Sequence, residues 1–311
     1  MRAVWLREFG GPEVLVPGEA PDPVPGPGQV LVEVAFANIT FVETQFRAGA
    51  PGPFKAAPPV IPGNGVGGVI SAVGPGVDPG LAGQRVVTST GGSGGYAERV
   101  AVDAAAVFEV PPALALDAAV ALLADGRTAT GLVHAAGVRP GDRVLVEAAA
   151  GGVGSLLVQL AKAAGATVIG AAGGPAKVAR VRGADAVVDY LRPDWTSSVG
   201  PLDVVFDGVG GAIGTAAFGL LREGGRMAAY GLAGGSWAEV SPEAAAARGV
   251  SLVQSIGTPD ELRAFTESAL TAAAAGDLVP VIGQRFPLEK AADAHAAIES
   301  RATVGKTLLV T

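Results

Sequence analysis

A short apolar segment, a glycine turn and a helical pattern follow one another between residues 143 and 164. The apolar segment is Arg143-Val144-Leu145-Val146, and the turn reads Ala148-Ala149-Ala150-Gly151-Gly152-Val153-Gly154. Apolar residues then recur at helical spacing, at Val153, Leu156, Leu157, Leu160, Ala161 and Ala164. A strand, a glycine turn and a helix in this order predict a dinucleotide site at the turn of an α/β sheet.

The glycines of the turn suit such a site. Gly151 lets the backbone approach a pyrophosphate, and Gly154 lets the helix pack close to the strand. The helix N-terminus offers unpaired N–H groups and the positive end of its dipole to the phosphates. Ala148 stands where the usual fingerprint has its first glycine. The alternative is a plain tight turn. The candidate cofactor-binding residues here are Ala150, Gly151, Gly152 and Val153.

The residues after the next strand indicate which dinucleotide binds. An NAD site usually places Asp or Glu there for the ribose 2′-hydroxyl, but residues 166–172 are followed by Gly173-Gly174-Pro175 and then Lys177. Gly173 leaves room for a 2′-phosphate and Lys177 can supply charge, which favours NADP(H). Tyr190 would cover the adenine side. The alternative for Lys177 is a solvated lysine on a helix, and the alternative for Tyr190 is an aromatic residue that only ends a strand.

The composition and the pattern of predicted elements change near residue 118. Residues 1–118 are rich in Pro and Gly with short β-like runs, which predicts a small antiparallel β domain. Strands and helices alternate over residues 119–257, and six strand-like segments there suit a doubly wound parallel sheet. Residues 258–311 would return to the first domain. Those strand-like segments are 143–148, 166–172, 185–190, 203–208, 225–231 and 251–256, with helices at 152–165, 175–182, 212–222 and 242–248.

Composition excludes several other classes of protein. The formal net charge of −7 disfavours binding to a nucleic-acid backbone as a main role. The chain has no cysteine, so disulfides and thiolate zinc sites are excluded. No run of about 18 apolar residues is free of charges or breaks, so we expect no membrane span. Residues 1–5 open directly into a strand pattern, so we expect no signal peptide. The composition agrees with a cytoplasmic enzyme.

The order and spacing of several further motifs resemble those of a known family. The chain is similar to the zinc-free medium-chain dehydrogenases/reductases of the NADPH:quinone oxidoreductase group. The resemblance implies a GroES-like β domain (residues 1–118 and 258–311), a Rossmann domain (119–257) and a cleft between them for NADPH and substrate. The matching motifs include Gly10–Leu15, Gly26–Val32, Val73–Val77, Gly83–Val86, Gly95–Glu98, Val205–Gly210 and His295–Arg301.

The resemblance also implies roles for single residues. Lys177, Tyr190 and Arg301 match positions around the 2′-phosphate, where an arginine fork can bind phosphate bidentately. Thr128 matches a residue beside the nicotinamide, and Gly231 matches a strand end along the nicotinamide half. Relatives would pair two subunits along the edge strand Ser251–Ile256, so we expect a homodimer.

The departures from the family pattern fall in the expected substrate pocket. Gln45 and Pro51 replace frequent tyrosines, and Gly65 stands where zinc relatives carry a glutamate. A tyrosine proton donor therefore has no obvious candidate there, and no metal is expected. The residues expected to shape a polar pocket are Thr40, Glu43, Asn64, Asp125 and Arg127, and those that would polarise the acceptor are Thr40, Asn64 and Thr128.

These observations predict an NADPH-dependent reductase. Hydride would pass to an electrophilic carbon of a quinone or an α,β-unsaturated carbonyl, and the protein would place the reactants and polarise the acceptor oxygen. One alternative is a tailoring enone or enoyl reductase of small-molecule biosynthesis. Another is a non-catalytic NADPH-binding or RNA-binding protein of the same fold.

Overall fold

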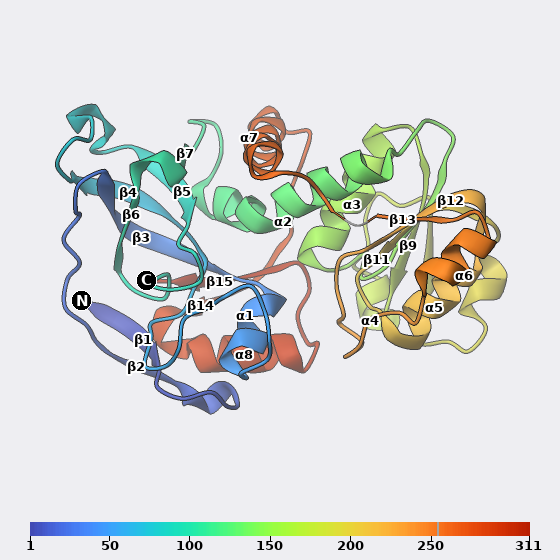
Figure 1. Ribbon diagram of the computed structural model, residues 1–311, viewed down its shortest axis with the longest axis horizontal. Coiled ribbons are helices and arrows are strands. Elements are labelled where there is room, and N and C mark those ends of the chain that lie inside the picture. Colours follow the sequence, from blue (N-terminus) through green and yellow to red (C-terminus); the bar gives the residue numbers. More distant parts are fainter. Residues whose placement is uncertain (254) are drawn as a thin grey trace. The chain divides into compact units, whose positions relative to one another are not determined.

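The computed structural model describes residues 1–253 and 255–311. The chain forms two compact units (Figure 1), of which unit 1 comprises Met1–Ala124 and Leu270–Thr311, and unit 2 comprises Asp125–Ala269. The long helix α2 (Leu116–Ala136) begins in unit 1 and ends in unit 2, and α7 (Pro259–Ala275) leads back.

Unit 2 contains a six-stranded parallel sheet in the order β10-β9-β8-β11-β12-β13. In chain order, β8, β9 and β10 are added one after another toward one edge of the sheet. The next three strands, β11, β12 and β13, are added from β8 toward the opposite edge. The strand order thus reverses between β8 and β11, where open α/β sheets bind ligands at the carboxyl ends of their strands. The strands are β8 (Arg143–Val146), β9 (Thr167–Ala172), β10 (Ala186–Asp189), β11 (Leu202–Asp207), β12 (Leu221–Ala229) and β13 (Ser251–Leu252).

Helices connect these strands, as the alternating pattern predicts. The strands at the centre of the sheet are mainly apolar, as in a sheet covered on both faces; β11 is buried at every position, including Asp203 and Asp207. The doubly wound parallel sheet is therefore confirmed. The helices are α3 (Gly152–Ala163), α4 (Pro175–Val178), α5 (Gly211–Gly219) and α6 (Pro242–Ala247), with the short 3-10 helix Trp195–Ser198.

Unit 1 is built on a mainly antiparallel sheet in the order β14-β15-β3-β4-β5-β7, with β6 also paired to β3. A separate hairpin joins β1 to β2. The strands are β1 (Arg2–Leu6), β2 (Leu15–Glu19), β3 (Gln29–Ile39), β4 (Gly65–Val73), β5 (Arg85–Ser89), β6 (Arg99–Asp103), β7 (Val107–Glu109), β14 (Ile282–Pro287) and β15 (Lys306–Val310).

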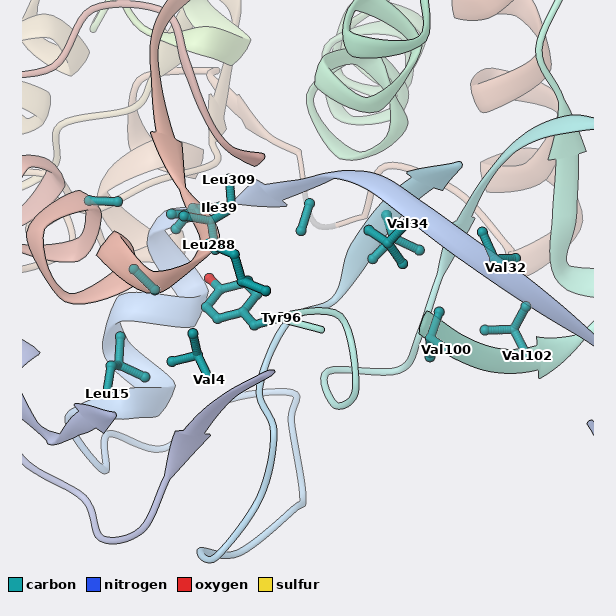
Figure 2. Close-up of a cluster of buried hydrophobic side chains, with 14 of the residues drawn as sticks. Val4, Leu15, Val32, Val34, Ile39, Tyr96, Val100, Val102, Leu288 and Leu309 are labelled. Carbon is teal, nitrogen blue, oxygen red and sulfur yellow. The ribbon is translucent and has the colours of Figure 1, made fainter. Parts of the chain in front are cut away.

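The larger of two apolar clusters in this unit packs against this sheet. Figure 2 shows Val4, Ile39, Tyr96 and Leu288 together in it. Alternate residues of β3 enter the core, as period-two burial requires. Two helices lie wholly within this unit, α1 (Phe41–Arg47) and α8 (Ala291–Glu299), with 3-10 turns at Pro12–Val14, Pro79–Leu81, Ala104–Ala106 and Leu288–Lys290.

The structure differs from the sequence expectations at several elements. The expected helices omit both α1 and α2, and α4 ends at Val178 rather than near residue 182. The expected edge strand Ser251–Ile256 is paired only over Ser251–Leu252, and Gln254 lies outside the described residues. Subunit pairing along this edge stays a prediction. Among the described residues, none of the helices is both long and apolar enough to cross a membrane.

Candidate functional site

The glycine turn lies at the carboxyl end of β8, at the centre of the parallel sheet. The turn closes through the Gly151 N–H, which donates to the Ala148 carbonyl at 2.8 Å. Ala148 has a φ of 49°, a left-handed conformation that explains why this position usually carries glycine. A Cβ on Gly154 would lie 2.2 Å from the Ala148 carbonyl oxygen, so α3 packs directly on the turn. Gly154 therefore serves helix packing, as predicted.

Gly151 differs from Gly154 in the space around it. A Cβ on Gly151 would meet only the Ala148 oxygen, at 3.1 Å. Gly151 is also the N-cap residue of α3, and the first N–H groups of a helix have no partner within it. This end of α3 therefore has the geometry that binds a pyrophosphate.

The neighbouring strand end brings Gly173 and Tyr190 together. A Cβ on Gly173 would lie 2.8 Å from the Tyr190 ring, so the two positions are in contact. Lys177 lies on α4 directly after this loop and is half-buried. The carboxylate of Asp189 accepts the N–H groups of Gly174 and Leu191, at 2.8 and 3.0 Å. Both N–H groups bond to the same carboxylate oxygen, Oδ1 of Asp189.

Helix α2 carries three of the candidate residues within one turn. Asp125 is 7% exposed, whereas Arg127 and Thr128 are half-buried. Burial lowers the pKa of Arg127 below its usual value. Gly231 follows β12, and a Cβ there would lie 2.8 Å from the Gly208 carbonyl oxygen. The ends of β11 and β12 are therefore packed closely at the side where the nicotinamide is expected.

In unit 1, the Glu43 carboxyl joins Thr40 to Asn64. Its Oε2 accepts the backbone N–H of Thr40 at 2.7 Å and the Thr40 hydroxyl at 3.0 Å. Its Oε1 accepts the backbone N–H of Asn64 at 2.9 Å. Glu43 is only 1% exposed, and its burial raises the pKa of the carboxyl above the usual value. The buried Glu43 carboxyl thus holds Thr40 and Asn64 in place through hydrogen bonds.

These contacts separate the candidate roles of Thr40 and Asn64. The Thr40 hydroxyl donates its hydrogen bond to Glu43, so toward a ligand it can only accept a hydrogen bond. The Asn64 Oδ1 accepts a hydrogen bond from the Ser89 hydroxyl at 2.8 Å. Within the described residues, the Asn64 Nδ2 has no hydrogen-bond partner. Asn64 is therefore the better donor toward an acceptor oxygen.

Tyr96 and His295 form a buried pair in the core of unit 1. Tyr96 Oη and His295 Nε2 lie 2.9 Å apart, and both residues are 0% exposed. Burial lowers the pKa of His295 to about 3, so the imidazole is neutral. Burial also raises the pKa of Tyr96 well above its usual value, with a further contribution from Glu43. His295 is therefore a packed core residue of α8.

Replacing Tyr96 by phenylalanine is expected to leave most of the activity intact. The change removes one buried hydrogen bond, which costs about 1 kcal/mol of stability, and it removes no group that faces solvent. Steady-state kinetics and thermal unfolding of Tyr96→Phe check this. A loss of turnover with unchanged cofactor affinity would show instead that Tyr96 supplies a proton to the reaction.

Arg301 lies in unit 1, directly after α8. Its φ of 57° places a non-glycine residue in the left-handed region, where most helix ends use glycine. The side chain is exposed. Because Lys177 and Tyr190 belong to unit 2, joint binding of a 2′-phosphate by these three residues stays a prediction.

The residues around Gly65 do not suit a metal. A Cβ on Gly65 would lie 2.5 Å from the Asn38 Nδ2, so a glutamate side chain has no room at this position. Among the described residues, no group of three or more His, Asp or Glu side chains has the arrangement of a metal site.

Sequence reasoning missed three residues that shape these sites. Ser89 orients Asn64, and Glu147 and Asp207 lie fully buried at the ends of β8 and β11. The signal for the carboxyl pair is present in the chain, because each acid directly follows an apolar run. Acids at the ends of neighbouring central strands are unusual in a core.

Comparison with known proteins places this architecture in a family. Residues 26–112 match the family model described as alcohol dehydrogenase GroES-like domain, and residues 182–309 match the one described as zinc-binding dehydrogenase. The chain is 33% identical to a quinone oxidoreductase of Homo sapiens, over 100% of this chain and 98% of the relative. It is also 33% identical to a 2-haloacrylate reductase of a Burkholderia species, over 99% and 98% of the two chains.

A solved structure extends this similarity to the fold. The crystal structure of the Escherichia coli quinone oxidoreductase complexed with NADPH has a TM-score of 0.89 and 29% identity. The match covers 100% of both chains. The GroES-like and Rossmann folds that the sequence predicts are both confirmed.

Proposed function

This chain belongs to the medium-chain dehydrogenase/reductase superfamily, and we propose that it reduces a quinone or an α,β-unsaturated carbonyl with NADPH and without a metal. The protein is an oxidoreductase, as its relatives are. The relatives include reductases of both acceptor classes, since a 2-haloacrylate is an unsaturated carboxylate.

The glycine turn at the switch point of the parallel sheet carries this proposal. Gly151 leaves the end of α3 open, and Gly173 follows the next strand where an NAD enzyme would have an acid. Ala150, Gly152 and Val153 complete the turn on the pyrophosphate, and Lys177, Tyr190 and Arg301 would hold the adenosine 2′-phosphate. The residues present thus fit NADPH, whose chemistry when bound is hydride donation.

Each side chain has a limited task in such a reaction. Asn64 Nδ2 would donate a hydrogen bond to the acceptor oxygen as negative charge develops there. Glu43 and Ser89 hold Asn64 in place. Thr128 and Gly231 would position the nicotinamide. The reduced acceptor takes its proton from water, since Gln45 and Pro51 provide no tyrosine hydroxyl.

A panel of acceptors tests the proposed function. Quinones, enones and enoyl thioesters are each supplied with NADPH, and oxidation of the cofactor is followed by absorbance. We expect turnover with at least one quinone or enone, and transfer of deuterium from C4-labelled NADPH to the β-carbon of an enone. If no acceptor in a broad panel is reduced, the reductase proposal fails.

Loss of either cationic side chain should weaken the binding of NADPH more than that of NADH. A charged hydrogen bond contributes about 1.5–3 kcal/mol, so Lys177→Ala or Arg301→Ala should raise the Kd of NADPH about 10- to 100-fold. The Kd of NADH should change little. Arg301→Gly is a useful second variant, because glycine relieves the positive φ and should not lower stability. Equal losses for both cofactors would contradict the assignment.

Removal of metal ions should leave the activity unchanged. The chain has no cysteine, and a catalytic zinc needs about three protein ligands. Dialysis against EDTA followed by the acceptor assay and elemental analysis checks this. Stoichiometric zinc whose removal stops turnover would overturn the metal-free mechanism.

A further inference from the structure

Two carboxyl groups lie side by side beneath the cofactor-binding turns of unit 2. Val146 of β8 pairs with Phe206 of β11, and Glu147 and Asp207 are the next residues of the two parallel strands. The Glu147 N–H donates to the Phe206 carbonyl at 3.0 Å, which continues the pairing. Both acids are 0% exposed. Paired positions of neighbouring strands place their side chains on the same face of the sheet.

Among the described residues, only one of the four carboxyl oxygens of this pair has hydrogen-bond donors. Asp207 Oδ1 accepts the backbone N–H groups of Val209 and Gly210, at 2.9 and 2.6 Å. Among the described residues, Asp207 Oδ2 and both carboxyl oxygens of Glu147 are buried without a hydrogen-bond partner. Ionised carboxylates only accept hydrogen bonds, so two of them in contact would leave these three oxygens unpaired.

One proton resolves this conflict. The two carboxyls stand on paired neighbouring strands and interact with each other, and a protonated Glu147 can donate to Asp207 Oδ2. Burial, followed by the neighbouring Asp207, raises the pKa of Glu147 to about 10. Like-charged carboxyls in one site commonly share a proton in this way.

We propose that Glu147 is a carboxylic acid at neutral pH, that it shares its proton with Asp207, and that this hydrogen bond positions the turns that bind NADPH. The proposal rests on the proposed function only in that NADPH is the ligand of those turns. Glu147 is thus a positioning residue, because it acts through the backbone of the turns.

The pair is connected to three strand ends. Asp207 shapes the turn after β11 through Val209 and Gly210. The Glu147 carbonyl accepts the Tyr230 hydroxyl at 3.0 Å, which joins the end of β8 to the end of β12. Ala148, with its positive φ, follows Glu147 directly. A change in the distance between the two carboxyls therefore moves the turns on either side of the switch point.

The surroundings make ionisation of Glu147 unfavourable. The titratable groups that act on this cluster are Asp207 on β11, Tyr230 after β12, Tyr190 after β10 and Asp125 on α2. All four are acids, so each is neutral or negative. A second negative charge between β8 and β11 would separate the strand ends through repulsion, and NADPH would bind less tightly.

The first experiment compares Glu147→Gln with Glu147→Leu. The glutamine amide can donate to Asp207 Oδ2, so the Kd of NADPH at pH 7 should stay within about twofold of the wild type. Leucine cannot donate and leaves the Asp207 charge unpaired, which should raise the Kd about 10-fold or more. If glutamine weakens binding as much as leucine does, the shared proton has no positioning role.

The pH dependence provides a second readout. As the pH is raised toward 10, the wild-type Kd should rise because Glu147 ionises, whereas that of Glu147→Gln should rise less. All other side chains are the same in both proteins, so the difference between the two profiles reports on Glu147. Parallel pH profiles would contradict the proposal.

Infrared spectroscopy tests the proton itself and needs no cofactor. The wild type at pH 7 should show the carbonyl stretch of a protonated carboxylic acid, and Glu147→Gln should lose that band. In Asp207→Asn the amide can donate to Glu147, so Glu147 ionises and the band should also disappear. Absence of the band from the wild type would overturn the proposal, whereas a wild type that has the band but binds no NADPH would overturn the proposed function instead.

Discussion

Valine in place of Gly151 is expected to abolish NADPH binding while the protein remains folded. A Cβ at this position meets only the Ala148 oxygen, at 3.1 Å, so a shift of a few tenths of an ångström accommodates it. The two methyl groups of valine then occupy the space in front of the first turn of α3, where the pyrophosphate should approach the N–H groups. Loss of two charged hydrogen bonds corresponds to about 100-fold or more in Kd.

Two further glycines provide the controls for this variant. Gly219 is exposed at the end of α5 and has no atom within 4 Å of a built Cβ, so Gly219→Val should leave the Kd unchanged. At Gly154 a Cβ would lie 2.2 Å from backbone, so Gly154→Ala should lower thermal stability as well as affinity. Fluorescence titration and thermal unfolding of the three variants distinguish these cases. NADPH binding by Gly151→Val at wild-type affinity would mean that the pyrophosphate lies elsewhere.

The parallel sheet could be predicted from the sequence because its signals are local. Short apolar runs make up most of β8, β9 and β11, as is typical of central parallel strands. The glycine turn identified β8, the first strand of the parallel sheet in the chain, and α3, the helix that follows it. Both features depend on residues adjacent in the chain, so no knowledge of packing was needed.

The two helices that were missed show where this reasoning fails. Helix α1 starts at a Thr40-x-x-Glu43 sequence, a capping-box pattern, although the two residues are predicted above only as part of the substrate pocket. Helix α2 is apolar on most of its circumference and is rich in alanine. Its pattern therefore lacks the contrast between apolar and polar faces on which helix prediction depends.

The polar sites could be predicted only in part, because their contacts join distant segments. Thr40 and Asn64 were both candidates, yet nothing in the sequence indicated that one buried carboxyl holds them together. The Ser89 contact with Asn64 crosses 25 positions, and Glu147 and Asp207 are 60 positions apart. Sheet register creates these contacts, and register follows from the tertiary fold.

Replacing Asn64 by alanine is expected to lower kcat strongly and to leave NADPH affinity unchanged. Asn64 Nδ2 is the donor that would stabilise the charge developing on the acceptor oxygen, and loss of one such donor typically costs about 100- to 1,000-fold in kcat. The backbone N–H of residue 64 still donates to Glu43, so the local fold should persist.

The control for this variant is Ser89→Ala, which tests the orientation of the amide. Without the Ser89 hydroxyl the Asn64 side chain is free to rotate, because its Oδ1 loses the contact at 2.8 Å. We expect an intermediate loss in kcat, about 10-fold, since the donor is present but no longer held in place. Thr40→Val should have a smaller effect than Asn64→Ala, because the Thr40 proton is directed at Glu43. If Thr40→Val stops turnover while Asn64→Ala does not, the donor is the threonine hydroxyl, which must turn its proton from Glu43 to the acceptor when the acceptor binds.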